Sequence, residues 1–274
     1  MTTDGEQQTY VFLHGISVPR PVKLCDTVQL LPVTQVPDPD VALQAAQTPE
    51  DAAAFLLLLP RISSQLRIVA PDQMSLATRV WNSGWDALLL GAAFACEVGH
   101  NIESESPAEE TTGQTALRTT NTHFHGIRRE PVEIDENDCL WLEKHFQQAR
   151  TLLDKEAFSS SMHCLASYHW HPHPRPRLSL LWSGIEGLFR IESELTFRLS
   201  LAAAKFLEPN DRDAAREIFR NIKRLYKSRS QAVHGGELKG DASVVVSESA
   251  KILQLLLRRC IETQQLPDVD ELVL

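Results

Sequence analysis

Apolar residues recur every three or four positions from Asn137 to about Thr263, and this period constrains the fold more than any other feature of the chain. Such spacing gives a helix one apolar stripe, and several short-linked helices of this kind bury their stripes against one another. We therefore predict that residues 136–274 form a bundle of five or six helices. The expected helices cover residues 137–153, 159–170, 178–191, 195–207, 211–233 and 243–263.

The first part of the chain has a different pattern. Short runs rich in β-branched and apolar residues predict strands at 9–13, 28–33 and 66–70. Thr48, followed by Pro49, predicts the start of a helix. Residues 81–97 are apolar and fit either a helix or a buried strand. We therefore expect an α+β protein, with a mixed α/β domain at 1–135 before the helical bundle.

Residues 101–122 are dominated by Glu, Ser, Thr and Pro and have almost no large apolar side chain. A segment of this composition buries too little apolar surface to offset the entropy lost on ordering. We expect a loop or linker there, and we place the domain boundary near residue 135.

Composition and charge limit the classes of protein that the chain can belong to. Its 274 residues are 43% hydrophobic and 23% charged, with a net charge of -9 and a sequence pI near 5.6. An acidic chain binds nucleic acid only through a local basic patch. The five scattered cysteines form no C-x-x-C pair, which favours a reducing cytoplasm over a disulfide framework. The polar start and the short apolar runs predict neither a signal peptide nor a membrane span.

Two charged residues interrupt the apolar stripes of the bundle. The stripe at 218, 222 and 225 continues to Arg229, and the stripe of the 178–191 helix contains Glu186. A carboxylate and a guanidinium on facing helices could pair with two-pronged geometry. The pair could be a structural salt bridge, or it could line a polar cleft that holds a reactive histidine. A third alternative is that one side chain extends to solvent.

His234 follows Arg229 by five residues, just before Gly235 and Gly236. On one unbroken helix this spacing rotates the second side chain by about 500° and raises it by about 7.5 Å, so the two do not share a face. We expect them to converge only where the helix loosens before Gly235, or where a second chain completes the site.

At this point the sequence resembles a known family. The run Tyr226–Gly236 matches the R-x4-6-H signature of the HEPN superfamily of nucleotide-binding helical domains. Upstream, the G-I-E-G-L-F core at 184–189 and the small-residue segment 195–204 resemble the Apea-like branch. The match covers roughly residues 137–265. The resemblance implies an up-and-down helical bundle, a homodimer formed through the motif face, and metal-independent cleavage of RNA without a cofactor.

The same resemblance implies roles for individual residues. Arg229 and His234 would be the catalytic pair, with Glu186 and Ser230 in the surrounding polar pocket. Ser230 stands where many active members have Asn, Asp or His, and its hydroxyl can still donate and accept hydrogen bonds. A histidine can act as base or acid near neutral pH, and arginine suits the phosphoryl oxygens. Because the motif has one histidine, a two-fold dimer would supply the second.

The basic residues of the same helix would supply the local field that binds RNA. The predicted RNA-binding residues are Arg220, Lys223, Arg224 and Lys227.

Other patterns are weaker. His163, Cys164, His169, His171 and His173 lie in or near a proline-rich segment, where we favour a loop with incidental histidines over a metal site. The chain has no P-loop, dinucleotide-binding, zinc-protease or nucleophile-elbow motif.

Two functional hypotheses follow. The first is a prokaryotic HEPN endoribonuclease, an RNA-cleaving effector in antiviral defence or a toxin-like system, whose residues 1–135 sense a phage trigger or a regulatory protein. The second is a non-catalytic HEPN module that binds RNA, a nucleotide or a protein, with Glu186 and Arg229 as a structural pair. We predict a cytoplasmic location, no metal and no membrane contact.

Overall fold

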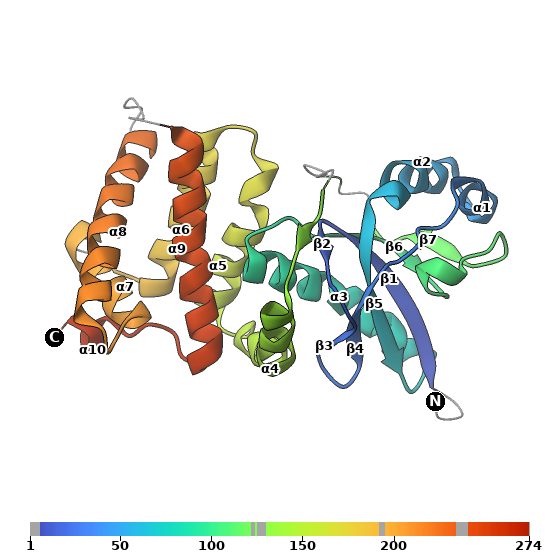
Figure 1. Ribbon diagram of the computed structural model, residues 1–274, viewed down its shortest axis with the longest axis horizontal. Helices are drawn as coiled ribbons and strands as arrows, with labels where there is room; N and C mark the ends of the chain where they lie inside the picture. Colours follow the sequence, from blue (N-terminus) through green and yellow to red (C-terminus); the bar gives the residue numbers. More distant parts are fainter. Residues whose placement is uncertain (1–5, 122–123, 125–129, 192–194, 234–240, 274) are drawn as a thin grey trace. The chain divides into compact units, whose positions relative to one another are not determined.

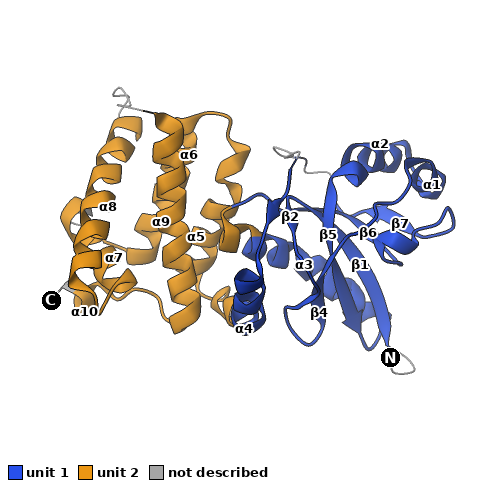
Figure 2. Ribbon diagram, in the orientation of Figure 1, with its two compact units in different colours: residues 1–90, 96–147 blue, residues 91–95, 148–274 orange. Residues whose placement is uncertain are grey.

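The computed structural model describes residues 6–121, 124, 130–191, 195–233 and 241–273. It has 61% helix and 15% strand, with an antiparallel sheet followed by helices, and this confirms the predicted α+β class (Figure 1). The chain forms two compact units (Figure 2). The sheet unit comprises residues 1–90 and 96–147, and the helical unit comprises residues 91–95 and 148–274.

A six-stranded antiparallel sheet with the order β3-β4-β5-β1-β6-β7 is the centre of the sheet unit, and β2 pairs in parallel with β8. The strands are β1 (Gln7–His14), β2 (Ile16–Ser17), β3 (Val22–Lys23), β4 (Val28–Pro32), β5 (Ile62–Ala70), β6 (Gly99–Ser104), β7 (Leu117–Thr119) and β8 (Val132–Glu133). The helices are α1 (Pro39–Ala45), α2 (Pro49–Leu58), α3 (Gln73–Phe94) and α4 (Glu136–Leu152), with short 3-10 turns at Leu59–Arg61 and Ala108–Glu110.

The predicted strands and the predicted helix start are confirmed. β1, β4 and β5 cover the three expected runs, and the Thr48 hydroxyl accepts a hydrogen bond from the backbone N–H of Asp51 at the start of α2. The ambiguous segment after residue 81 is helical, as part of α3. Tyr10 and Phe12 of β1 pack with Phe55 of α2 in one core cluster.

The predicted loop or linker at 101–122 is wrong at 101–104 and 117–119, whereas residues 105–116 form a loop with one short 3-10 turn. Residues 101–104 lie in β6, which pairs with β1, and residues 117–119 form β7 at the edge of the sheet. The polar composition is compatible with a strand because the buried charge that it contains has partners. The buried Glu103 carboxylate accepts hydrogen bonds from Arg118 at 2.8 Å and from Thr9 at 3.0 Å.

The boundary between the units also differs from the prediction near residue 135. Residues 136–147 of α4 belong to the sheet unit, and residues 91–95 at the end of α3 belong to the helical unit. The sequence composition does not predict which unit these two segments join. For example, α4 has the same helical period as the bundle helices that follow it.

The helical unit contains α5 (Glu156–Ser167), a 3-10 turn (Tyr168–Trp170), α6 (Pro174–Phe189), α7 (Leu195–Leu207), α8 (Arg212–Val233), α9 (Ala242–Thr263) and α10 (Val269–Val273). The expected helices from 159 onward are all present, with ends shifted by a few residues. The largest shift is in α6, which starts at Pro174 rather than at Leu178. Within the proline-rich segment 169–177, the residues outside the 3-10 turn and α6 are 171–173. Pro174 can start α6 because the first helical position needs no backbone N–H for a hydrogen bond within the helix.

Gly184 explains how α6 fits between its neighbours. A Cβ atom at this position would lie 2.9 Å from both the Cβ of Cys164 on α5 and a methyl group of Leu253 on α9. The glycine therefore lets α6 approach both helices closely, and α6 carries Glu186 half a turn further on.

None of the helices in the described ranges combines the length and the apolar character that crossing a membrane requires.

Candidate nucleic-acid interface

Arg229 and Glu186 meet between α8 and α6 in the helical unit. The Arg229 Nη2 donates a hydrogen bond to the Glu186 Oε2 at 3.0 Å. The two side chains are 23% and 22% exposed, so both are half-buried and partly screened from water. The structure thus pairs the two residues that interrupt the apolar stripes of their helices.

Arg229 and Glu186 share one hydrogen bond rather than two. The Arg229 Nε and the Glu186 Oε1 are both buried and have no hydrogen-bond partner among the described residues. The expected two-pronged geometry is therefore not formed, and one donor and one acceptor of the pair remain unsatisfied within the described ranges.

One aromatic ring lies against the arginine, and a second ring supports the first. The guanidinium lies over the Tyr226 ring, 5.6 Å from its centroid, and Tyr226 makes an edge contact with Trp182 at 5.2 Å. The Trp182 indole donates to the Ser249 hydroxyl on α9 at 3.2 Å. Burial raises the pKa of Tyr226, the nearby Glu186 carboxylate raises it further, and Arg229 partly opposes both effects. These rings give the guanidinium a fixed platform of the kind that cation–π contact favours.

The other predicted site residues have different positions. Ser230 is half-buried on α8, about 100° around the helix from Arg229, so the two side chains leave the axis in different directions. His234 lies outside the described residues. α8 is helical through Val233, so the expected loosening does not occur before that residue.

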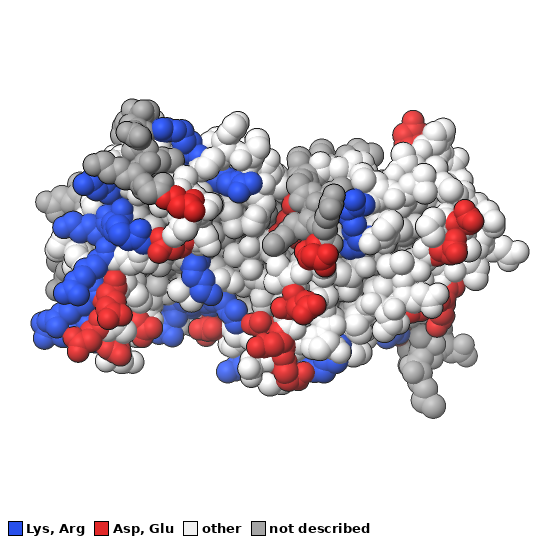
Figure 3. Space-filling model, turned by 45° about the horizontal axis from the view of Figure 1, so that its top comes forward, with Lys and Arg blue, Asp and Glu red and all other residues white. Residues whose placement is uncertain are grey.

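The exposed side of α8 carries a stripe of basic side chains. Spacings of three and four residues place six cations within about 120° of the helix circumference and along about 22 Å of its axis. All six are exposed, and Figure 3 shows basic side chains gathered at the left of the molecule, over the region of α8. We call this set the basic ridge, and its members are Arg212, Arg216, Arg220, Lys223, Arg224 and Lys227.

Two members of the basic ridge have acidic partners. Arg216 pairs with Asp213 at 3.0 Å, and Arg224 pairs with Glu248 of α9 at 2.6 Å. The other four cations have no ion-pair partner in the described part of the chain. Three of the four predicted RNA-binding residues, Arg220, Lys223 and Lys227, are therefore exposed and form no ion pair with any described residue, whereas Arg224 pairs with Glu248.

The histidines that the sequence singled out are dispersed. His163 is half-buried on α5, and a ring nitrogen of His169 lies 3.0 Å from the carbonyl oxygen of Ala95. His171 and His173 are exposed, and Cys164 is half-buried on α5. No cluster of three or more His, Cys, Asp or Glu side chains within the described ranges could hold a metal ion.

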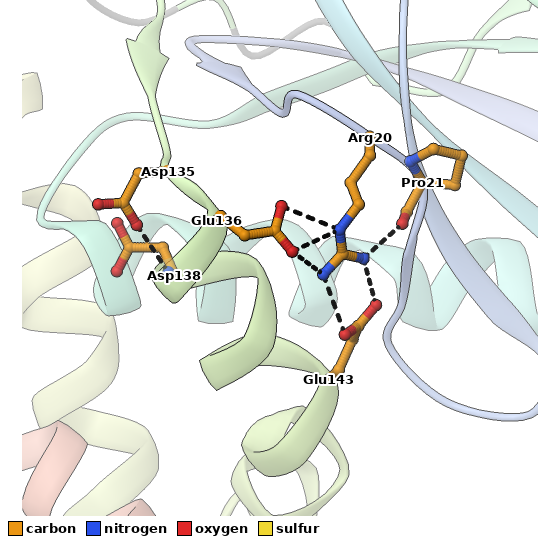
Figure 4. A network of polar contacts seen from close by, with 6 residues as sticks. All are labelled: Arg20, Pro21, Asp135, Glu136, Asp138 and Glu143. Carbon is orange, nitrogen blue, oxygen red and sulfur yellow. Dashed lines mark hydrogen bonds and ion pairs between the residues drawn. The ribbon is translucent and has the colours of Figure 1, made fainter.

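The sheet unit has a polar network of its own, centred on Arg20 (Figure 4). The guanidinium binds Glu136 and Glu143 on α4 and donates to the carbonyl oxygen of Pro21 at 2.9 Å. Two carboxylates and a carbonyl occupy its donors, so this network joins the β2–β3 segment to α4 rather than presenting a charge to a ligand.

Some residues of the interface were not expected from the sequence. Tyr226 precedes Arg229 by three positions, and this helical spacing could have indicated the ring contact. Arg212 extends the basic ridge by one more step of four from Arg216.

Comparison with models of protein families finds no match, and neither does comparison with curated proteins or with solved structures.

Proposed function

We propose that the helical unit binds RNA along the basic ridge and cleaves it near Arg229, as a metal-independent endoribonuclease of the HEPN type. The observation that carries this proposal is the basic ridge itself. A chain with a net charge of -9 places six exposed cations on one face of the helix that contains Arg229. Such a local stripe suits the phosphates of a nucleic acid in a protein whose overall charge repels them.

The reaction that suits these residue types uses the substrate's own hydroxyl. The 2′-oxygen attacks phosphorus, its proton passes to a base, and the bond from phosphorus to the 5′-oxygen breaks as an acid protonates the leaving oxygen. The products are a 2′,3′-cyclic phosphate and a 5′-hydroxyl. His234 is proposed as base or acid, and Arg229 is proposed to stabilise charge on the phosphoryl oxygens. Ser230 is proposed as a further donor in the same pocket.

The ion pair of Arg229 supports a second candidate function, a helical module without catalytic activity. Glu186 already neutralises the guanidinium, and a half-buried ion pair between two helices is also what a structural contact looks like. In this alternative the bundle binds RNA on the basic ridge without cutting it.

Further parts of the proposal derive from the family resemblance. A homodimer formed through the Arg229 and His234 face would supply a second histidine. A role as an effector in antiviral defence, with a sheet unit that senses a phage trigger or a regulatory protein, would place the protein in the cytoplasm.

One experiment separates cleavage from binding. Purified protein is incubated with total RNA in EDTA beside the His234→Ala variant and the matched control His171→Ala, which alters an exposed histidine outside the motif. We expect fragments ending in a 2′,3′-cyclic phosphate from the wild type and the control, and a loss of at least about 100-fold in His234→Ala. Equal cleavage by His234→Ala would reject His234 as the base or acid, and no cleavage by any of the proteins would leave only the binding alternative.

The basic ridge is tested by the salt dependence of RNA affinity. Removing one phosphate contact lowers the slope of log affinity against log salt by about 0.7 for single-stranded RNA. Lys223→Gln and Lys227→Gln should each show this change, and Lys205→Gln, an exposed lysine on α7, should not. Unchanged slopes in both ridge variants would show that these lysines do not contact the RNA phosphates, and would contradict RNA binding along the basic ridge.

A further inference from the structure

Arg175 reaches from the first turn of α6 to the last turn of α8. Its Nη1 donates hydrogen bonds to the carbonyl oxygens of Gln231 at 3.2 Å and Ala232 at 3.1 Å. The side chain is half-buried, and its residue lies in the proline-rich segment to which the sequence assigned no role. One guanidinium nitrogen therefore joins the start of one helix to the end of another.

The two carbonyls that it binds are groups that a helix cannot satisfy by itself. The last four carbonyl oxygens of an α-helix have no N–H partner within the helix, and they also carry the negative end of the helix dipole. A cation at this end stabilises the final turn through both the hydrogen bonds and the dipole. Arg175 thus holds the turn that runs from Arg229 to Val233.

Two prolines restrict the backbone around Arg175. Pro174 and Pro176 flank it, and each ring fixes its own φ angle near the helical value. Pro174 stands at the first position of α6, where a missing N–H removes no hydrogen bond. The backbone on both sides of Arg175 therefore has little freedom to lose when the side chain binds α8.

We propose that Arg175 is a positioning residue that fixes the last turn of α8, and with it Arg229. This inference rests on the proposed function for its consequence, because the fixed turn leads into the Arg229–His234 motif. Arg175 is not a member of the basic ridge, so it acts through the turn rather than by binding RNA.

Hydrogen exchange of the full-length protein, followed by mass spectrometry, tests the contact without any enzymatic assay. Arg175→Gln should speed exchange of the amides at 229–233 by about five- to tenfold, because the hydrogen bonds and the dipole contact weaken together. Arg175→Lys should restore part of the protection. Arg177→Gln is the matched control, since Arg177 donates to the His171 carbonyl within its own segment at 2.5 Å. Exchange over α9 should stay unchanged in all three variants.

Exchange at 229–233 that matches the wild type in Arg175→Gln, or that rises equally in Arg177→Gln, would overturn the proposal. The RNA assay then separates a positioning role from a simple helix cap. Positioning predicts a lower cleavage rate at saturating RNA with the half-saturating concentration nearly unchanged, and partial rescue by Arg175→Lys. Faster exchange with wild-type cleavage would reject the role in the site. If the wild type does not cleave RNA, the proposed function fails, and the exchange comparison alone decides whether Arg175 fixes the turn.

Discussion

At the scale of single residues, the balance between Arg229 and Glu186 decides what the interface can do. The ion pair is half-buried, uses one hydrogen bond, and leaves a donor and an acceptor without described partners. Removing one charge leaves the other uncompensated in a place that water reaches poorly, which is more costly than removing both. The stability of the variants therefore measures how strongly the fold depends on the pair.

A double-mutant cycle gives the coupling between the two side chains. We expect Glu186→Gln and Arg229→Gln each to lower the free energy of unfolding by about 1–2 kcal/mol, and the double variant to lose less than the sum by about 1 kcal/mol. Urea denaturation monitored by circular dichroism provides the four values. The exposed pair Arg216 and Asp213 serves as a control cycle, with an expected coupling below about 0.5 kcal/mol. A coupling near zero for Glu186 and Arg229 would show that the pair does not hold α6 to α8.

The ion pairs of Arg20 contribute to the stability of the sheet unit rather than to the candidate interface. The hydrogen bond from Arg20 lowers the pKa of the Glu143 carboxyl below the ordinary value. A carboxyl with a lowered pKa in the folded state adds stability that is present above the unfolded pKa and is lost as the pH falls through the folded pKa.

The stability difference between the wild type and Arg20→Gln should therefore depend on pH. We expect the wild type to unfold at a higher urea concentration near pH 7, and the gap to shrink at acidic pH, as the pH falls through the lowered pKa of the Glu143 carboxyl. Glu143→Gln is the control, because it has no titrating group at that position and should remove much of the pH dependence. A gap that is the same near neutral pH and at acidic pH would show that the network contributes no charge-dependent stability.

At the scale of elements, α6 and α8 contain the residues of the candidate interface, and the sequence predicted both helices from the spacing of their apolar residues. An apolar stripe with one charged interruption predicts both the helix and the inward direction of Arg229. Periodicity made the pairing with Glu186 one of the alternatives, and the structure shows that the pair forms. The number of hydrogen bonds in that pair depends on side-chain torsions, which periodicity does not determine.

The sheet unit shows what the sequence pattern misses. β6 and β7 read as a polar loop because Glu103 and its neighbours find their partners in distant strands, and such partners are invisible in a local window. The hydrogen bonds from Arg175 to α8 were missed for the same reason, since they join residues more than fifty positions apart.

The two glycines of the α6 motif offer a test of this helix. A methyl group at Gly184 would press on α5 and α9, whereas one at the exposed position Gly187 would lie no closer than 3.8 Å to its nearest described neighbour outside α6, the buried Ser161 hydroxyl. We expect Gly184→Ala to lower the free energy of unfolding by about 1–2 kcal/mol through overpacking. Gly187→Ala should raise it by about 0.5–1 kcal/mol, because alanine favours the helix. Thermal and urea unfolding of both variants would check these signs, and stabilisation by Gly184→Ala would contradict the close packing of α6.

At the scale of the whole molecule, charge and assembly determine whether the interface can act. The net charge of -9 opposes RNA for the protein as a whole, so binding should be local to the basic ridge and should weaken steeply with salt. Cleavage by the proposed mechanism needs a base and an acid, and the motif supplies one histidine to each chain. The proposal therefore requires a second copy of the chain at the Arg229 face.

Activity should then depend on protein concentration. We expect the cleavage rate per chain to rise with concentration, and to level off where sedimentation velocity shows that the dimer predominates, because dimer formation follows mass action. Both measurements use the same samples and the same salt, since ionic strength also changes RNA affinity. Arg175→Gln should follow the same concentration dependence with a lower plateau, which separates a loss of site geometry from a loss of assembly. Full activity per chain at concentrations where only the monomer sediments would reject the dimer, and with it the need for two histidines at one scissile phosphate.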